Sequence, residues 1–223
     1  MRTYLFKRLL LDLFYPNRCG FCGCNIPYDE YFCNTCAKRF TPPPQNVKIA
    51  NIDEFGAVTT YDGFSKPFVA KFKKENNGYA VSGAAYLIYK NLLREGGLRE
   101  FDVIAFIPMR KRELYRRGYN QTKLIAKELA WLTDKPCAAL LKKVKDTKPQ
   151  KALKARDRAE NVKDAFRCIS EKAVKGKTVL IVDDISTTGS TLSEAARALK
   201  TAGAGSVKAA VFAKTRALLE KNS

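Results

Sequence analysis

Residues 179–191 read "VLIVDDISTTGST", an apolar and β-branched run that stops at two adjacent acids and continues into small hydroxyl residues around one glycine. An apolar run of this kind is typical of a parallel strand that is buried on both faces. The following stretch, "STLSEAARALKTAGAG" (190–205), has apolar residues at helical spacing, followed by a glycine stop: Leu192, Ala195, Ala196, Leu199 and Gly203. The sequence therefore predicts a buried strand, a tight loop and the N-terminus of a helix.

The loop between this strand and this helix has the chemistry of a phosphate site. Unpaired backbone N–H groups at a helix N-terminus favour an anion. Gly189 lets the backbone approach a ligand closely, and five hydroxyls add donors: Ser186, Thr187, Thr188, Ser190 and Thr191. Asp183 and Asp184 would repel a phosphate, but they would accept hydrogen bonds from sugar hydroxyls or hold Mg²⁺. A sugar phosphate satisfies both halves; the alternative is a capped turn with incidental acids.

The rest of the chain after residue 55 alternates strand-like and helix-like stretches. The strand-like ones are "FGAVTTY" (55–61), "FDVIAFIP" (101–108) and "SVKAAVFAKT" (206–215). Between them lie an amphipathic region over 68–92, a basic turn after Pro108, and a helical stretch, "NQTKLIAKELAWL" (120–132). On that stretch one helical face carries Thr122, Ile125, Leu129 and Leu132, and Trp131 is also interpreted as a core residue. We expect an α/β fold with an open, mostly parallel sheet, whose ligands bind beyond the carboxyl ends of the strands.

The charge is strongly basic, with 41 Lys and Arg against 22 acids and a net charge of +19. Residues 110–175 hold 20 Lys and Arg and 8 acids, so a local excess of +12 carries most of the total. Such a balance indicates a polyanionic partner, which could be nucleic acid, a phosphorylated ligand or an anionic membrane surface. A solvated face that serves only solubility is the alternative.

Five of the seven cysteines lie in "CGFCGCNIPYDEYFCNTC" (19–36). Two Cys-x₂-Cys pairs, formed by Cys19, Cys22, Cys33 and Cys36, are typical of a structural zinc site in a segment too small to fold on burial alone. Cys24 breaks the spacing and is interpreted as a spare thiol; a pair of disulfides is the alternative. Three prolines at 42–44 mark a boundary. We therefore expect an N-terminal helix and zinc module (1–41), a linker (42–54) and a main domain (55–223).

The first forty residues lack the pattern of a secretory signal, and no segment approaches the roughly 20 apolar residues of a membrane helix. We expect a cytoplasmic protein. Tyr4, Leu5, Leu9 and Phe14 predict an amphipathic N-terminal helix, which either packs on its own domain or makes a peripheral contact with a partner or the inner face of the membrane.

The opening stretch resembles the phosphoribosyl pyrophosphate (PRPP) motif of type I phosphoribosyltransferases. The resemblance implies that Asp183 and Asp184 hold the ribose hydroxyls, with Mg²⁺, and that the loop 186–191 grips the 5′-phosphate. It also implies that "IPMRKRELYRRG" (107–118) receives the pyrophosphate through Arg110, Lys111 and Arg112. Thr187 stands where hypoxanthine-guanine enzymes have an aspartate, which disfavours a 6-oxopurine. The chain has no histidine and no N-terminal catalytic cysteine, so an imidazole base and a glutamine-dependent amidotransferase are not expected.

A wider resemblance covers nearly the whole chain. The cysteine module, "RRGYNQ" (116–121), the basic "TKPQKALKARDRAENVKDAF" (147–166) and the PRPP motif together resemble the ComF family of competence proteins. The family implies handling of incoming single-stranded DNA in the cytoplasm during natural transformation, and no reaction is established for it as a whole. We predict that pyrophosphate or DNA is contacted by Arg116, Arg117, Asn120, Gln121 and Arg156. Arg156 belongs to a mobile basic loop that also contains Thr147, Gln150, Arg158 and Asn161.

Both groups of polar residues also have a purely structural interpretation. The "RRGYNQ" residues could simply cap a helix, and the 147–166 segment could be a solvated linker. Single-stranded DNA binding favours aromatic side chains beside the cations, and Tyr115 and Tyr119 are the best candidates for stacking with bases.

Three hypotheses follow. In the first, the chain binds single-stranded DNA through its basic middle segment, with PRPP or a related phosphosugar as a modulating ligand. In the second, it is an active phosphoribosyltransferase with an unidentified acceptor. In the third, the zinc module and N-terminal helix dock onto a DNA-uptake helicase or membrane channel. The sequence specifies no oligomeric state.

Overall fold

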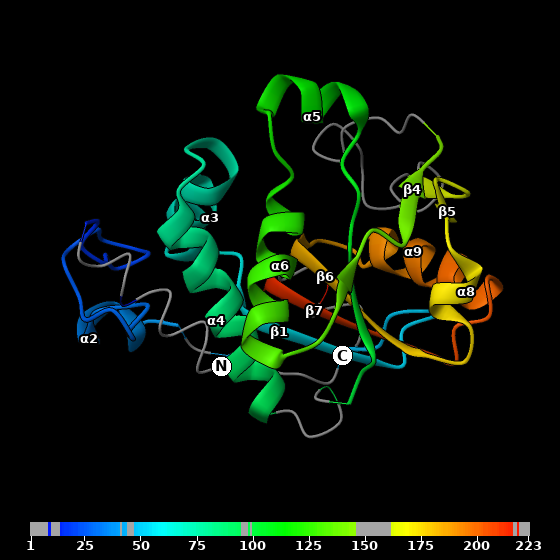
Figure 1. Ribbon diagram of the computed structural model, residues 1–223, viewed down its shortest axis with the longest axis horizontal. Helices are drawn as coiled ribbons and strands as arrows, with labels where there is room; N and C mark the ends of the chain where they lie inside the picture. Colours follow the sequence, from blue (N-terminus) through cyan, green and yellow to red (C-terminus); the bar gives the residue numbers. More distant parts are fainter. Residues whose placement is uncertain are drawn as a thin grey trace.

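The fold is built on one parallel sheet. A computed structural model describes residues 9, 14–40, 42–43, 47–94, 98, 100–145, 162–215 and 218. The sheet has five strands in the order β1-β7-β6-β2-β3, and every neighbouring pair is parallel. Figure 1 shows these strands, which are β1 (Glu54–Thr60), β2 (Val103–Phe106), β3 (Cys137–Ala138), β6 (Thr178–Ser186) and β7 (Ser206–Lys214).

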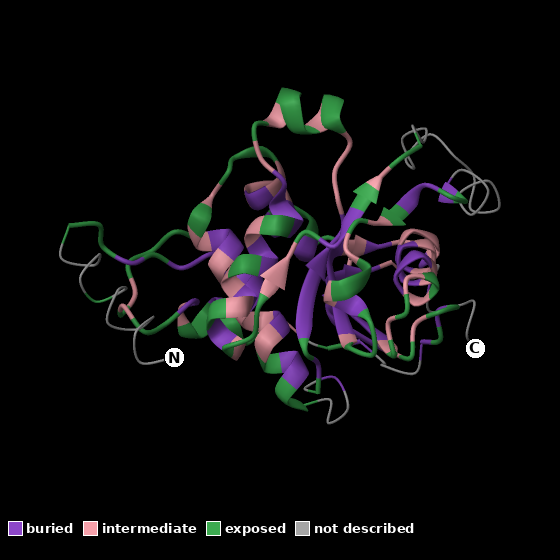
Figure 2. Cartoon of the chain, turned by 45° about the vertical axis from the view of Figure 1, so that its right-hand side comes forward, coloured by how far each residue is buried: buried purple, intermediate pink, exposed green. Residues whose placement is uncertain are grey.

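Helices cover both faces of this sheet (Figure 1). One face carries α3 (Ser65–Lys74), α4 (Gly78–Arg94) and α6 (Gln121–Thr133). The other carries α9 (Ser190–Thr201), short α8 (Glu171–Val174) and a hairpin of β4 (Leu141–Lys143) and β5 (Phe166–Cys168). Strand β6 is buried along almost its whole length, as Figure 2 shows for the purple centre of the molecule. The prediction of an open parallel α/β sheet is therefore confirmed.

The strand order locates the ligand-binding edge. From β2 the chain passes through α6 to β3 on one side, and from β6 it passes through α9 to β7 on the other. The two connections diverge between neighbouring strands β2 and β6, which makes this the topological switch point where doubly wound sheets bind ligands. The sequence singled out two stretches at this edge: 107–118, which follows β2, and 183–191, which comprises the last four residues of β6 and the loop into α9.

Three local expectations differ from the structure. The amphipathic region over 68–92 is two helices separated by a turn, in which Asn76 takes a φ of 48°. The basic turn after Pro108 contains a short helix, α5 (Lys111–Arg117), which ends at Gly118 with a φ of 79°. The predicted helical face of α6 is buried, since Thr122, Ile125, Leu129 and Leu132 are all buried, but the placement of Trp131 in the core was wrong, because this residue is 54% exposed.

The cysteine module, which contains α2 (Asn34–Ala37), packs against α3 and α4 through aromatic rings. Phe21 stacks on Phe64 with ring centroids 4.6 Å apart, and Tyr31 stacks on Tyr86 at 4.2 Å and an interplanar angle of 7°. The module therefore shares one apolar core with the helical face of the sheet. Most of the predicted N-terminal helix, including Tyr4 and Leu5, lies outside the described residues. Among the residues that are described, no helix is long and apolar enough to cross a membrane.

Candidate functional site

The acidic pair lies at the carboxyl end of β6 and is held by two neighbouring helices. Asp183 is 9% exposed and Asp184 is 5% exposed. The Asp183 Oδ1 atom accepts the backbone N–H of Asp184 at 2.8 Å and the hydroxyl of Thr122 at 3.5 Å. The Asp184 Oδ2 atom accepts Nε2 of Gln121 at 2.8 Å and lies 2.9 Å from the ammonium of Lys73. Helices α3 and α6 thus both reach the pair with polar side chains.

The electrostatics of the pair favour a ligand that brings hydroxyl donors or positive charge. Burial, followed by the negative charge of Asp184, raises the pKa of Asp183 from 3.8 to about 7. Among the described residues, Lys73 is the cation that forms an ion pair with the acids, through Asp184. Two carboxylates with one ammonium fit the hydroxyls of a sugar or a hydrated Mg²⁺, which would bind through Asp183 and Asp184.

The loop after the pair has the geometry of an anion cradle. Gly189 takes a φ of 77° as the residue that caps α9, and a Cβ added there would lie 3.1 Å from the side chain of Ile49. The hydroxyls of Thr188 and Ser190 are 2.8 Å apart. Among the buried side-chain N and O atoms of the described residues, Ser186 Oγ is the one without a hydrogen-bond partner. A buried hydroxyl without a partner is unusual unless a ligand completes it, so the loop fits a phosphate.

The segment after β2 forms a basic arm, defined here as residues 110–117. Figure 1 places its helix, α5, at the top of the molecule and away from the sheet, and Figure 2 shows that its surface is largely exposed. Arg110 precedes the helix, and exposed Lys111, Arg112 and Arg116 lie on it. The residue Tyr115 is 94% exposed. An exposed ring among cations is the combination that binds single-stranded nucleic acid.

The residues at 116–121 divide between structural and site roles. Asn120 caps α6 by accepting the backbone N–H groups of Thr122 and Lys123, which is the structural alternative considered for this motif. Gln121 instead reaches Asp184, and its Oε1 atom accepts Arg117 Nη1 at 2.6 Å. The Tyr119 hydroxyl accepts the backbone N–H of Asn76 at 3.1 Å.

The second predicted basic segment is mostly outside the described residues. Arg156, Thr147, Gln150, Arg158 and Asn161 all fall there. The chain leaves and re-enters the described part at the hairpin of β4 and β5. On the re-entry side, Arg197 of α9 bonds to both Asp164 and Glu194, and Glu194 accepts the backbone N–H of Asp164 at 2.7 Å. This network ties the end of the basic segment to the helix that begins at the anion cradle.

Sequence reasoning missed three residues at the site. Lys73 and Thr122 were taken as part of amphipathic helices, and their contact with the acids depends on how α3 and α6 pack. Lys214 is fully buried at the end of β7, opposite Ser186 in the strand register, and burial lowers its pKa to about 8. A lysine that ends the apolar run "AAVFAK" was a signal for Lys214, since lysine is rarely buried without a purpose.

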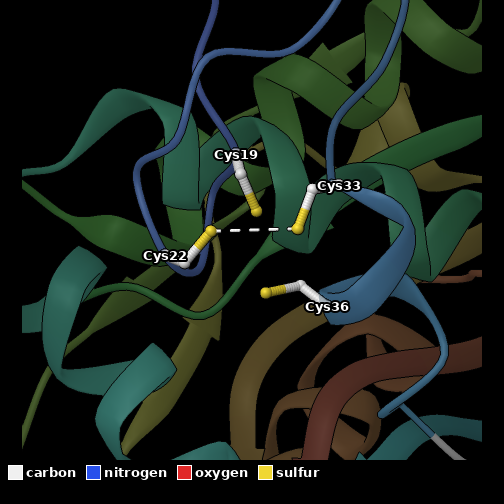
Figure 3. A group of neighbouring side chains, drawn as sticks. All are labelled: Cys19, Cys22, Cys33 and Cys36. Atoms are coloured by element: carbon white, nitrogen blue, oxygen red, sulfur yellow. Dashed lines mark hydrogen bonds between the residues drawn. The ribbon is translucent and has the colours of Figure 1, made fainter.

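The four predicted cysteine ligands come together. Their sulfur atoms all lie within 4.8 Å of one another, and Figure 3 shows them pointing toward a common centre. Tetrahedral zinc with Zn–S bonds of about 2.3 Å needs sulfurs roughly 3.8 Å apart, and the Sγ atoms of Cys22 and Cys33 are 3.8 Å apart. The backbone N–H of Cys24 is the main cause that lowers the pKa of the Cys22 thiol to about 6, which favours a metal-binding thiolate. The cluster fits a structural metal.

Comparison with known proteins agrees with this geometry. Residues 115–223 match the family described as "Phosphoribosyl transferase domain". The parallel sheet, the switch-point acids and this match define the main part of the chain as a phosphoribosyltransferase-type domain, joined to a four-cysteine module. A crystal structure of adenine phosphoribosyltransferase is 18% identical and covers 71% of this chain and 80% of its own, with a TM-score of 0.41.

Relatives matched over most of the chain identify the family. Competence protein F of Haemophilus influenzae is 30% identical over 190 residues, which cover 83% of this chain and 79% of that protein. DNA utilization protein YhgH of Escherichia coli K12 is 31% identical over 194 residues, which cover 85% of this chain and 81% of that protein. The chain belongs to the ComF family.

Proposed function

We propose that this protein handles single-stranded DNA in the cytoplasm during DNA uptake and that its switch-point site binds PRPP or a related phosphosugar with Mg²⁺. One observation carries the proposal: a buried acidic pair and a hydroxyl-rich loop lie at the switch point, and an exposed basic arm follows the neighbouring strand. The names of the two relatives, which refer to competence and DNA utilization, support the same role.

The phosphosugar would be bound by three sets of residues. Asp183 and Asp184 would accept the ribose hydroxyls and hold Mg²⁺, and residues 186–191 would receive the 5′-phosphate. The first three residues of the basic arm, Arg110, Lys111 and Arg112, would face the pyrophosphate. When bound, Mg²⁺ would neutralise negative charge on the ligand, and the protein side chains would orient the sugar. This assignment is supported by the buried hydroxyl of Ser186, which has no hydrogen-bond partner, and by the left-handed backbone of Gly189 at the start of α9.

The DNA strand would lie along the basic arm and the hairpin of β4 and β5. Lys142 and Arg167 face each other across the hairpin register, and Lys143 and Lys145 lie near them. Cations in this arrangement track phosphates, while the exposed ring of Tyr115 offers a stacking surface for a base. The cysteine module, with zinc, would stabilise the aromatic contacts that it makes with α3 and α4 through Phe21 and Tyr31.

Fluorescence anisotropy of a labelled single strand tests the DNA half of the proposal. The protein should bind the strand in preference to a duplex of the same sequence, and the affinity should fall steeply between two salt concentrations, because phosphate contacts release counterions. A strand that does not bind at low salt, or that binds no better than duplex, would contradict the proposal.

A second candidate is an active phosphoribosyltransferase with an unidentified acceptor. It is favoured by the match of residues 115–223 to the phosphoribosyl transferase domain family, because this stretch includes the acidic pair and the hydroxyl-rich loop. Release of pyrophosphate from PRPP in the presence of a panel of amines and nucleobases would support it. A panel that leaves PRPP intact while PRPP still binds would favour the ligand-binding role.

A further inference from the structure

One carboxylate oxygen joins two basic segments of the surface. Asp184 Oδ2 accepts Gln121 Nε2 at 2.8 Å and pairs with Lys73 Nζ at 2.9 Å. Lys73 belongs to the last turn of α3, which also carries Lys71 and Lys74. Gln121 is in turn held by Arg117 at the end of the basic arm, at 2.6 Å. A single acceptor at the centre of the sugar site thus fixes the positions of both segments.

A second contact ties the same two segments together away from the acids. The backbone N–H of Asn76, in the turn after α3, donates to the hydroxyl of Tyr119 at 3.1 Å. The end of α3 and the 116–121 segment are therefore adjacent, and both have a side chain that contacts Asp184. The side chain of Lys73 is 29% exposed, whereas that of Asp184 is 7% exposed, so the ammonium has a path to solvent that the carboxylate lacks.

We propose that Lys73 is a displaceable counter-cation of the sugar site, and that a phosphosugar bound with Mg²⁺ releases it from Asp184 to contact DNA phosphate. This inference rests on the proposed function and assigns its regulation to particular residues. Ribose hydroxyls would compete for the same Oδ2 atom, and a divalent cation at the acids would repel an ammonium 2.9 Å from one of them. Lys73 therefore stands in for the ligand and is not itself a phosphosugar contact.

The consequence is a linkage between the two ligands. When Lys73 leaves Asp184, the end of α3 gains an ammonium that is no longer paired with the acid. Because the turn after α3 contacts Tyr119, this change adds positive charge next to the 116–121 segment, which follows the basic arm. A phosphosugar should therefore tighten strand binding, and the strand should tighten phosphosugar binding by the same factor, because linkage is reciprocal.

Two lysine variants on the same helix test the proposal. Lys73→Met removes the counter-cation, and Lys74→Met removes an equal charge from the exposed neighbouring lysine, whereas it is Lys73 that pairs with Asp184. Isothermal titration with PRPP and Mg²⁺, and strand anisotropy with and without both, are measured for each variant and the wild type. A thermal melt checks folding, and Lys73→Gln replaces the Met variant if that variant does not fold.

In the wild type, PRPP with Mg²⁺ should tighten strand binding by about fivefold or more. Lys73→Met should bind PRPP several-fold more tightly, because the competitor is gone, and should lose the PRPP-dependent change in strand affinity. Lys74→Met should keep that change. A Lys73→Met protein that binds PRPP tenfold more weakly would overturn the inference, because Lys73 would then be a ligand contact. A full PRPP-dependent change in that variant would overturn it as well.

Failure of the inference is distinguishable from failure of the proposed function. A wild type that binds both ligands without any linkage removes the role of Lys73 and leaves the proposed function in place. A wild type that binds neither PRPP nor the strand removes both.

Discussion

Replacing Asp183 with asparagine should stabilise the protein at neutral pH while it damages the site. The side chain is buried, and its pKa rises from 3.8 to about 7 on folding. The folded state therefore binds more protons than the unfolded chain between these two values, and stability falls as pH rises through that window. Above pH 7 the destabilisation is complete. Asparagine carries no charge and can still accept the backbone N–H of Asp184 through its Oδ1 atom.

The size of the effect follows from the same shift. A rise from 3.8 to about 7 corresponds to about 4 kcal/mol. We expect about half of it, roughly 2 kcal/mol, because relaxation around a buried charge lowers its actual cost. For a chain of 223 residues, this gives an increase in Tm of roughly 4–8 °C.

Thermal unfolding of wild type and Asp183→Asn at pH 5, 6, 7 and 8 measures this prediction. The difference in Tm should grow from pH 5 to pH 7 and stay constant above pH 7. A difference that does not change with pH would show that Asp183 is not a destabilising buried charge. A variant less stable than the wild type at pH 8 would refute the reasoning outright, since it would mean that the carboxylate contributes net stability.

Three further predictions concern the other parts of the molecule. Cys33→Ser should lose the metal in elemental analysis, whereas Cys24→Ser should keep one zinc per chain; full metal content in Cys33→Ser would contradict the ligand set. Tyr115→Ala should weaken single-strand binding about tenfold in anisotropy, since stacking contributes roughly 1–3 kcal/mol per base, whereas Tyr15→Ala, also on an exposed tyrosine, should not; equal losses would remove Tyr115 from the DNA path. Gly189→Ala should lower the unfolding free energy by about 1 kcal/mol and weaken PRPP binding in calorimetry, because its φ is 77° and a Cβ would press on Ile49; Gly63→Ala, which meets open space, is the control, and identical behaviour of the two variants would argue against the strained loop.

The fold and the metal cluster were predictable because their signals are local. An apolar run that stops at two acids already defines a buried strand and the edge at which it ends. Paired Cys-x₂-Cys spacings likewise define the ligand set, and the four sulfurs lie together as expected. The prediction of Trp131 in the core failed because this residue lies nine positions after buried Thr122, which is two and a half helical turns and therefore the opposite side of α6.

The contacts of the acidic pair were not predictable from the sequence. Lys73 lies 111 positions before Asp184, on a helix whose basic last turn looks like any solvated helix end. Its contact with the acid depends on how α3 packs on the sheet, and Phe68 of α3 packs there against Phe21 of the cysteine module. The apolar run before Lys214 was a signal in the sequence, but the full burial of this lysine is known only from the structure, in which β7 lies between β1 and β6.

Isothermal titration of PRPP with Mg²⁺ into the wild type and the double variant Asp183→Asn/Asp184→Asn tests the central claim most directly. The account predicts binding of one PRPP per chain to the wild type and no measurable binding to the double variant, whose far-UV circular dichroism should remain that of the wild type. Equal affinity in the two proteins would contradict the claim that the acids at the end of β6 hold the sugar.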